Sequence, residues 1–348
     1  GVDFGIAALG RQAFVNAKET PGNGKDDDGN GYVDDVNGIG FTLYSDYTTD
    51  LLFPIRTLVA DPLQFQQYSK GMSDLRASVE SEEASALKKK LSSLPKDDYQ
   101  PFIEGLSAYG NYSHGTHVAG IAAAGNPAAQ LMAARLTYDH RIIGDRPTIA
   151  QAYKDAAAVV RTVDYFIEQG IRAVNMSWGG SLESVEAALE QTGAPGTSEE
   201  RRALARRIYD IGYKALFEAL RDAPGILFVI SAGNSDGNVA FDEFMPSSFK
   251  LPNIIVAGAV DQAGDETSFT SFGNSDVYAN GFEVESYVPG GARLKYSGTS
   301  MSAPNVTNLA AKLWALHPGL TVAQVKQLIV DGADAKQAGE RTLKLMNP

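Results

Sequence analysis

Short apolar runs alternate along this chain with longer segments of helical pattern, and this alternation constrains the fold more than any other feature. Strands are predicted at 130–136, 172–177, 225–231 and 253–260, and helices at 115–124, 149–168, 202–221, 303–316 and 322–330. Strands that alternate with helices form parallel sheets with helices on both faces. We therefore expect a doubly wound α/β fold with a mostly parallel sheet, which binds its ligands at the carboxyl ends of the strands.

The chain is 348 residues long, which suits one large α/β domain and would also allow two. We predict a single domain over 1–348 with two insertions, at about 51–108 and 181–207, because both stretches combine charged runs with helical apolar spacing. Each insertion is either a solvated elaboration or a segment that covers a cleft, docks a propeptide or contacts a partner.

The charge balance argues against two classes of partner. Lysine and arginine number 30 against 42 aspartates and glutamates, so the formal net charge is −12. An acidic protein does not attract nucleic acid or anionic membranes, and we expect neither as a partner. No apolar run reaches the roughly 18 residues of a membrane span. The chain has no cysteine, so disulfide and thiol chemistry are excluded.

Ser300 stands in a Gly-Thr-Ser turn shortly before an apolar stretch, 306–316, that predicts a buried helix. A hydroxyl at a helix N-terminus lies beside free backbone N–H groups and the positive end of the helix dipole, which stabilise negative charge on a reacting oxygen. Ser300 is thus a candidate nucleophile. A serine that only caps the helix would give the same local pattern.

A serine nucleophile needs a general base within hydrogen-bond reach. The chain has four histidines, and His114 lies in the segment Ser-His-Gly-Thr-His-Val-Ala-Gly, where a small-residue run suits a helix packed closely on a sheet. His114 is therefore the candidate base. The alternative is a metal site on His114 and His117, for which no third ligand is evident in the sequence.

Two predicted strands end in residues suited to binding a substrate. The strand at 225–231 leads to Ala-Gly-Asn, and the amide of Asn234 could donate to an oxyanion; a simple turn asparagine is the alternative. The strand at 172–177 ends in Ser-Trp-Gly-Gly. Bare backbone at such an edge can pair with an extended peptide.

The segments H-G-T-H-V-A-G, N-M-S-W-G-G, S-A-G-N and S-G-T-S-M-S-A-P, in this order, resemble those of the subtilisin-like serine proteases, the subtilases. The resemblance runs from residue 1 to about 330 and implies a subtilisin-like fold. It implies that His114 is the general base, Ser300 the nucleophile and Asn234 the side-chain oxyanion donor. The substrate-binding residues that it implies are Ser177, Trp178 and Gly179.

The catalytic aspartate of this family lies in a D-[ST]-G-[VI]-D stretch on a central strand. The chain begins Gly1-Val2-Asp3, which matches only the last three positions of that stretch. The resemblance therefore implies that the triad aspartate lies two residues before Gly1, and that an ordered protein contains the strand that carries it. Asp3 matches the family's second, non-catalytic aspartate, and its use as the triad acid is the alternative.

An acidic loop at 26–34 has the spacing of an EF-hand-type calcium loop, with Gly31 at the sixth position. Position 12 is Asn37 instead of the bidentate glutamate, so either the affinity is lower or another residue completes the shell. We expect structural Ca²⁺ here, and an acidic turn without an ion is the alternative. The expected ligands are Asp26, Asp28, Asn30, the carbonyl of Tyr32, and Asp34.

Together with the resemblance, these motifs predict a serine endopeptidase that hydrolyses polypeptides through a Ser/His/Asp triad and an acyl-enzyme. The alternative is a catalytically impaired, calcium-stabilised pseudoprotease that binds peptides. The resemblance also implies a propeptide or N-terminal fragment as a partner, and a secreted or periplasmic protein.

Overall fold

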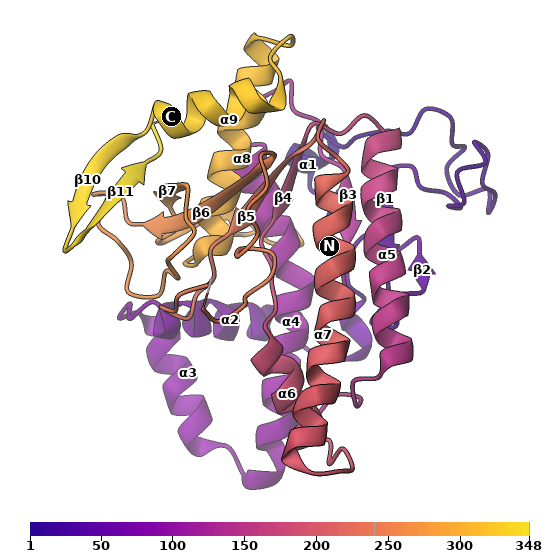
Figure 1. The fold of residues 1–348 in the computed structure, drawn as a ribbon. Coiled ribbons are helices and arrows are strands. Elements are labelled where there is room, and N and C mark those ends of the chain that lie inside the picture. The colour runs from indigo at the N-terminus through magenta and orange to yellow at the C-terminus, as the bar shows by residue number, and fades with distance from the viewer. Residues whose placement is uncertain (240, 348) are drawn as a thin grey trace. The chain divides into compact units, whose positions relative to one another are not determined.

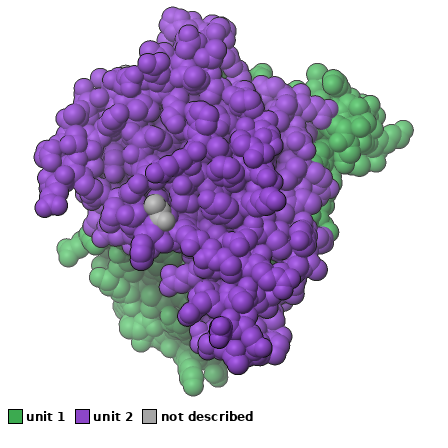
Figure 2. Space-filling model, in the orientation of Figure 1, with its two compact units in different colours: residues 1–142, 285–296 green, residues 143–284, 297–348 purple. Residues whose placement is uncertain are grey.

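The computed structural model describes residues 1–239 and 241–347 (Figure 1). They form two compact units, which Figure 2 shows in different colours. Unit 1 comprises 1–142 and 285–296, and unit 2 comprises 143–284 and 297–348. The candidate base and the acidic loop belong to unit 1, and the candidate nucleophile and oxyanion donor belong to unit 2.

A six-stranded sheet forms the framework of unit 2, in the strand order β10-β11-β7-β6-β5-β4 (Figure 1). Neighbours from β4 to β11 pair in parallel, and β10 runs antiparallel to β11. Strands β5 and β6 are buried along their whole length, as expected of central strands in a parallel sheet. The strands are β4 (Ala173–Met176), β5 (Leu227–Ser231), β6 (Ile254–Val260), β7 (Val277–Asn280), β10 (Asp334–Ala338) and β11 (Arg341–Leu345).

Helix α8 (Thr299–Leu316) packs on one face of this sheet. Val229 of β5 and Ile255 of β6 belong to one buried cluster with Val306 and Trp314 of α8. Each of these strand side chains is fully buried. The apolar stretch that predicted a buried helix therefore buries its side chains directly above the central strands.

The opposite face of the sheet is buried as well. Phe228 and Ile230 alternate with the residues that face α8, and both are fully buried. At the start of β6, the side-chain amide of Asn253 donates to the carbonyls of Leu220 and Ala223, at 2.8 and 3.0 Å, at the end of helix α7 (Ser198–Arg221). Helices lie against both faces, and the predicted doubly wound α/β fold is confirmed.

The remaining helices of unit 2 begin at capped positions. Thr148 caps α5 (Ile149–Glu168), and Thr321 caps α9 (Val322–Asp331) in a capping box with Gln324. The helix at 202–221 was predicted to begin too late, because a capping box of Thr197 and Glu200 starts α7 earlier. Helix α6 (Leu182–Gln191) lies within the predicted insertion at 181–207.

Unit 1 contains three long helices: α2 (Pro62–Arg76), α3 (Glu82–Ser93) and α4 (Lys96–Ala122). Two short ones, α1 (Ala7–Gly10) and the 3-10 helix η1 (Ile55–Thr57), precede them. The segment 51–108, predicted as helical, forms η1, α2, α3 and the first part of α4. The predicted start of a helix at 115 was wrong, because α4 continues from this segment into the His114 motif without a break.

The strands of unit 1 form a small three-stranded sheet and a hairpin. Strand β1 (Gly38–Phe41) pairs in parallel with β3 (Ala133–Arg135) and antiparallel with β2 (Tyr47–Thr48). Strand β9 (Arg293–Tyr296) pairs with β8 (Val284–Tyr287), whose first residue belongs to unit 2. Among the described residues, no helix is both long enough and apolar enough to cross a membrane.

Candidate functional site

Ser300 occupies the first turn of α8, after the N-cap residue Gly298. Its hydroxyl, which is partly buried, donates to the carbonyl of Ser177 at 3.4 Å, and the Ser177 hydroxyl donates to the Ser300 carbonyl at 2.9 Å. These contacts join the start of α8 to the carboxyl end of β4. As in the first turn of any helix, the Ser300 backbone N–H has no acceptor within its own helix and can bind an anionic oxygen.

Asn234 follows β5 and is held by the residue that precedes the candidate nucleophile. Its Oδ1 accepts from the backbone N–H of Thr299 at 2.8 Å and from the Thr299 hydroxyl at 2.9 Å. The backbone N–H of Gly233 donates to the same hydroxyl at 3.1 Å. With Oδ1 turned toward Thr299, the side-chain NH2 of Asn234 remains available as a donor. This nitrogen lies close to Gly298, 3.4 Å from the position of an added Cβ, and Asn234 is exposed.

Sequence reasoning missed two residues that position this group, Thr299 and Asn175. The amide of Asn175 donates to the Ser177 hydroxyl at 2.9 Å, and its Oδ1 accepts from the hydroxyl of Thr307 at 3.1 Å. Both residues stand inside the motifs that pointed to the site. Thr299 directly precedes Ser300, and Asn175 lies two residues before Ser177; these positions were the available signal.

The backbone at the Ser-Trp-Gly-Gly segment is partly paired within unit 2. Gly180 and Met245 exchange two N–H···O bonds, both of 2.9 Å. Gly179 lies so close to Phe244 that an added Cβ would come within 2.3 Å of its ring. The segment expected to present bare backbone therefore has a partner at Gly180, while Trp178 and Gly179 are partly exposed.

His114 lies on α4 in unit 1. Burial lowers the pKa of its imidazole from 6.5 to about 4. The ring is consequently neutral at pH 7, the state in which a nitrogen can accept a proton. Within the described residues of unit 1, no hydrogen bond orients this imidazole.

Asp3, the alternative triad acid, uses its carboxylate elsewhere in unit 1. One oxygen accepts from the backbone N–H of Gly5 and the other from that of Gly290, each at 2.9 Å. Its own backbone N–H donates to the hydroxyl of Thr116 at 3.0 Å. These bonds give Asp3 a structural role, joining the first residues of the chain to α4 and to the β8–β9 hairpin.

His117, the partner in the alternative metal site, is fully buried. Its Nε2 lies 3.0 Å from the carbonyl of Leu294, and its ring lies 4.7 Å from that of Tyr296, centroid to centroid. Among residues 1–239 and 241–347, one group of three side chains lies close enough together to hold a metal ion. Neither His114 nor His117 belongs to it. This geometry favours a structural role for His117.

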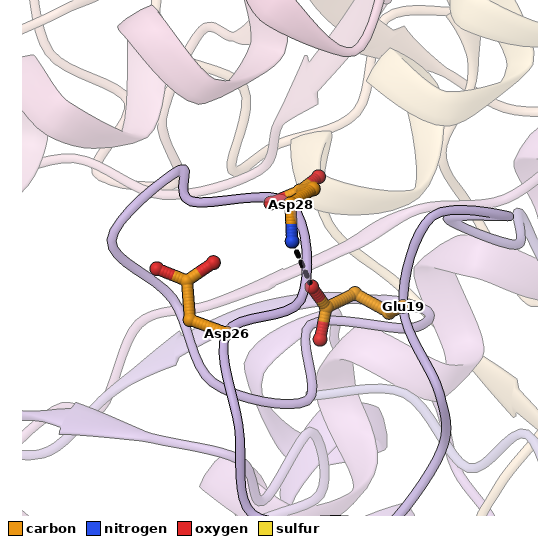
Figure 3. A group of neighbouring side chains, drawn as sticks. All are labelled: Glu19, Asp26 and Asp28. Carbon is orange, nitrogen blue, oxygen red and sulfur yellow. Dashed lines mark hydrogen bonds between the residues drawn. The ribbon is translucent and has the colours of Figure 1, made fainter.

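The acidic loop brings together Asp26 and Asp28, as predicted, and adds Glu19 (Figure 3). One carboxylate oxygen from each of the three lies within 4.8 Å of the others. Glu19 was not predicted as a ligand, because it precedes the loop and the loop spacing alone gives no signal for it. Hard oxygen donors of this kind suit a Ca²⁺ or Mg²⁺ ion.

The other predicted ligands of the loop make internal contacts. The Oδ1 of Asn30 accepts from the backbone N–H of Tyr32 at 2.8 Å, and its amide donates to Asp35 at 3.0 Å. The carboxylate of Asp34 accepts from the backbone N–H groups of Asn23 and Gly24, at 3.1 and 3.0 Å. Asp34 thereby closes the turn that precedes the loop.

A model of the subtilase family, described as a peptidase family, matches residues 89–345. This range includes His114, Ser177, Asn234 and Ser300, and it excludes the acidic loop.

Among curated proteins, the chain is similar to subtilisin of Bacillus pumilus, with 28% identity over 62% of this chain and 67% of that protein. It is 28% identical to subtilisin NAT of Bacillus subtilis subsp. natto, over 62% of this chain and 49% of that protein. It is 29% identical to a thermophilic serine proteinase of Bacillus sp. (strain AK1), over 64% and 47%. The aligned part thus spans about half the length of most of these relatives.

One solved structure, described as that of a cold adapted subtilisin-like serine proteinase, is 22% identical to this chain. The alignment covers 67% of this chain and 73% of that one, with a TM-score of 0.47.

Proposed function

The chain belongs to the subtilase family, and we propose that it is a serine endopeptidase that hydrolyses polypeptides. The observation that carries the proposal is the pair of donor groups at the start of α8. The Ser300 backbone N–H lies in the first turn of α8, and Thr299 holds Asn234 by its Oδ1. Two donors prepared in this way suit the oxyanion of a tetrahedral intermediate.

In the proposed mechanism, Ser300 Oγ attacks the scissile carbonyl while His114 accepts the hydroxyl proton. The Asn234 amide and the Ser300 N–H bind the oxyanion. His114 then gives its proton to the leaving amine, and water hydrolyses the acyl-enzyme by the same steps. A neutral imidazole at pH 7, which follows from the lowered pKa of His114, is the state that the first step requires. A carboxylate on the other ring nitrogen would complete the triad.

The substrate side of the proposal rests on the segment after β4. Ser177, Trp178 and Gly179 would line the peptide and the pocket for the residue before the scissile bond, as the family resemblance implies. We also propose, on the same resemblance, that the protein acts outside the cytoplasm and that a propeptide or N-terminal fragment is among its partners.

One observation favours a second candidate function, a peptide-binding pseudoprotease. Asp3 is engaged with backbone amides, and no hydrogen bond within unit 1 orients His114. A binding protein, however, has no use for an activated serine. The two functions differ in the reactivity of Ser300.

We expect a fluorophosphonate to label the intact protein at Ser300, because the reagent needs an activated hydroxyl and an oxyanion site together. Peptide mapping by mass spectrometry locates the adduct. A heat-denatured sample and the variant Ser300→Ala are the controls, and neither should be labelled at this position. An adduct on another serine, or none on folded protein, would favour the pseudoprotease.

A further inference from the structure

We propose that Glu19, Asp26 and Asp28 of the acidic loop bind one divalent cation, and that Glu19 takes the place that the loop spacing assigns to Asp34. This site is independent of the proposed hydrolysis. It lies wholly in unit 1, outside the residues that the family model matches. Figure 3 shows the three carboxylates, with Glu19 reaching the loop from the preceding segment.

The first argument is the state of the Glu19 carboxylate. Its Oε1 accepts from the backbone N–H groups of Asp27 and Asp28, at 2.9 and 3.2 Å, which fixes the side chain against the loop. Its Oε2 is buried and has no hydrogen-bond partner, and the residue is only 7% exposed. A buried carboxylate oxygen without a partner is costly, and a bound cation supplies the partner.

The second argument is electrostatic. Three carboxylates whose oxygens lie within 4.8 Å of one another repel each other when all are ionised. Within the described part of the chain, none of the three forms an ion pair with a lysine or arginine. A divalent cation neutralises most of this charge at one point.

The third argument is that the loop is already wrapped around Asp26. Its Oδ1 accepts from the N–H groups of Gly29 and Asn30, at 2.7 and 3.1 Å, and its Oδ2 accepts from that of Gly31 at 2.8 Å. Gly29 and Gly31 have φ values of +74° and +93°, which glycine adopts without strain. Asp28 is fixed similarly, because one of its oxygens accepts from the amide of Asn16 at 3.1 Å.

The donor set favours calcium. Calcium accepts six to eight oxygen ligands in flexible geometry, so three carboxylates can be supplemented by carbonyls and water. Asp34 is the weaker candidate, because its carboxylate is not among the three whose oxygens lie within 4.8 Å of one another.

The test compares two charge-removing variants, Glu19→Gln and Asp34→Asn, in a Ser300→Ala background that prevents self-digestion. Titration of the metal-free protein with CaCl₂ in a calorimeter gives the affinity directly. We expect Glu19→Gln to weaken calcium binding by about tenfold or more, because one charged ligand is lost. We expect Asp34→Asn to change it by less than about threefold.

Melting temperatures distinguish a metal ligand from a structural residue. In EDTA, Glu19→Gln should melt at or above the parent protein, because it relieves carboxylate repulsion and keeps the acceptor for Asp27 and Asp28. In millimolar calcium, the parent should gain stability and Glu19→Gln should gain much less. A parent protein that binds no calcium at millimolar concentration would overturn the proposal. So would an Asp34→Asn variant that loses binding while Glu19→Gln retains it.

Discussion

Ser300→Ala and His114→Ala should each lower kcat for peptide hydrolysis by roughly 10⁶, a magnitude that comes from a subtilisin. The reason is that the two residues work together. The hydroxyl is a weak nucleophile without its base, and without the hydroxyl the base has no nucleophile to activate. The double variant should therefore be no slower than either single variant. Rates are measured on a chromogenic peptide, with the folded fraction set by the melting curve.

Ser302→Ala is the matched control for this prediction. Ser302 lies on the same helix, is fully buried, and donates its hydroxyl to the carbonyl of Gly258 at 2.7 Å. Its loss should cost about 1 kcal/mol of folding free energy and leave the rate per folded molecule near that of the parent. Equal losses in Ser300→Ala and Ser302→Ala would show that the helix start matters only for folding. Multiplicative losses for Ser300 and His114 would contradict a shared proton transfer.

Much of the unit 2 framework could be predicted from the sequence, because burial leaves a clear signal there. The segment 225–231 is a continuous apolar run, and it forms β5 with every residue buried. The helix at 149–168 was predicted with the boundaries that α5 has, since Thr148 caps its first turn and its apolar side chains recur at helical spacing.

The C-terminal hairpin, β10 and β11, shows why some strands could not be predicted from the sequence. Strands β10 and β11 consist mostly of charged, polar and exposed residues, and among their described side chains only Leu343 is buried. Without alternating burial there is no period of two to detect. Strand β11 joins the sheet through a pair of Leu345 with Tyr278 of β7, a long-range contact that local sequence does not encode.

Glycine misled the prediction for α4. Gly115 was taken as a helix boundary, yet it lies within α4. A glycine is needed there because the backbone of Gly1 packs against it. A Cβ there would come within 2.3 Å of the Gly1 carbonyl oxygen, and one at Gly120 within 2.2 Å of the Ser286 hydroxyl. Pro101 also lies inside α4, although proline removes one intrahelical N–H bond.

The sequence predicted the candidate reactive groups, Ser300 and Asn234, from their hydroxyl and amide chemistry, but it did not predict the residues that hold them. In the structure Thr299 binds Asn234 and directly precedes Ser300. Thr299 binds Asn234 and Gly233, and Asn175 accepts from Thr307; sequence spacing shows none of these long-range contacts. Glu19 was not predicted as a ligand, because the loop spacing describes only residues inside the loop.

The Asn234 amide should account for a loss of about 10²–10³ in kcat when it is replaced, as in Asn234→Leu. The donor acts on negative charge that develops in the transition state, so KM should change little. Asn234→Asp should lose at least as much, because it keeps the acceptor for Thr299 but removes the donor and adds a negative charge. Steady-state kinetics on one peptide substrate, with kcat and KM separated, measures this.

Thr299→Val separates positioning from donation. It keeps the backbone N–H bond to Asn234 Oδ1 at 2.8 Å and removes the hydroxyl bond at 2.9 Å, together with the acceptor for Gly233. The loss of one orienting hydrogen bond should lower kcat by about tenfold. In the Asn234→Leu background the same change should have almost no effect on kcat, since nothing remains to orient. If Asn234→Leu raised KM and left kcat unchanged, the amide would bind the ground-state peptide. If Thr299→Val lowered kcat equally in both backgrounds, its role would lie in the start of α8 and not in the oxyanion donor.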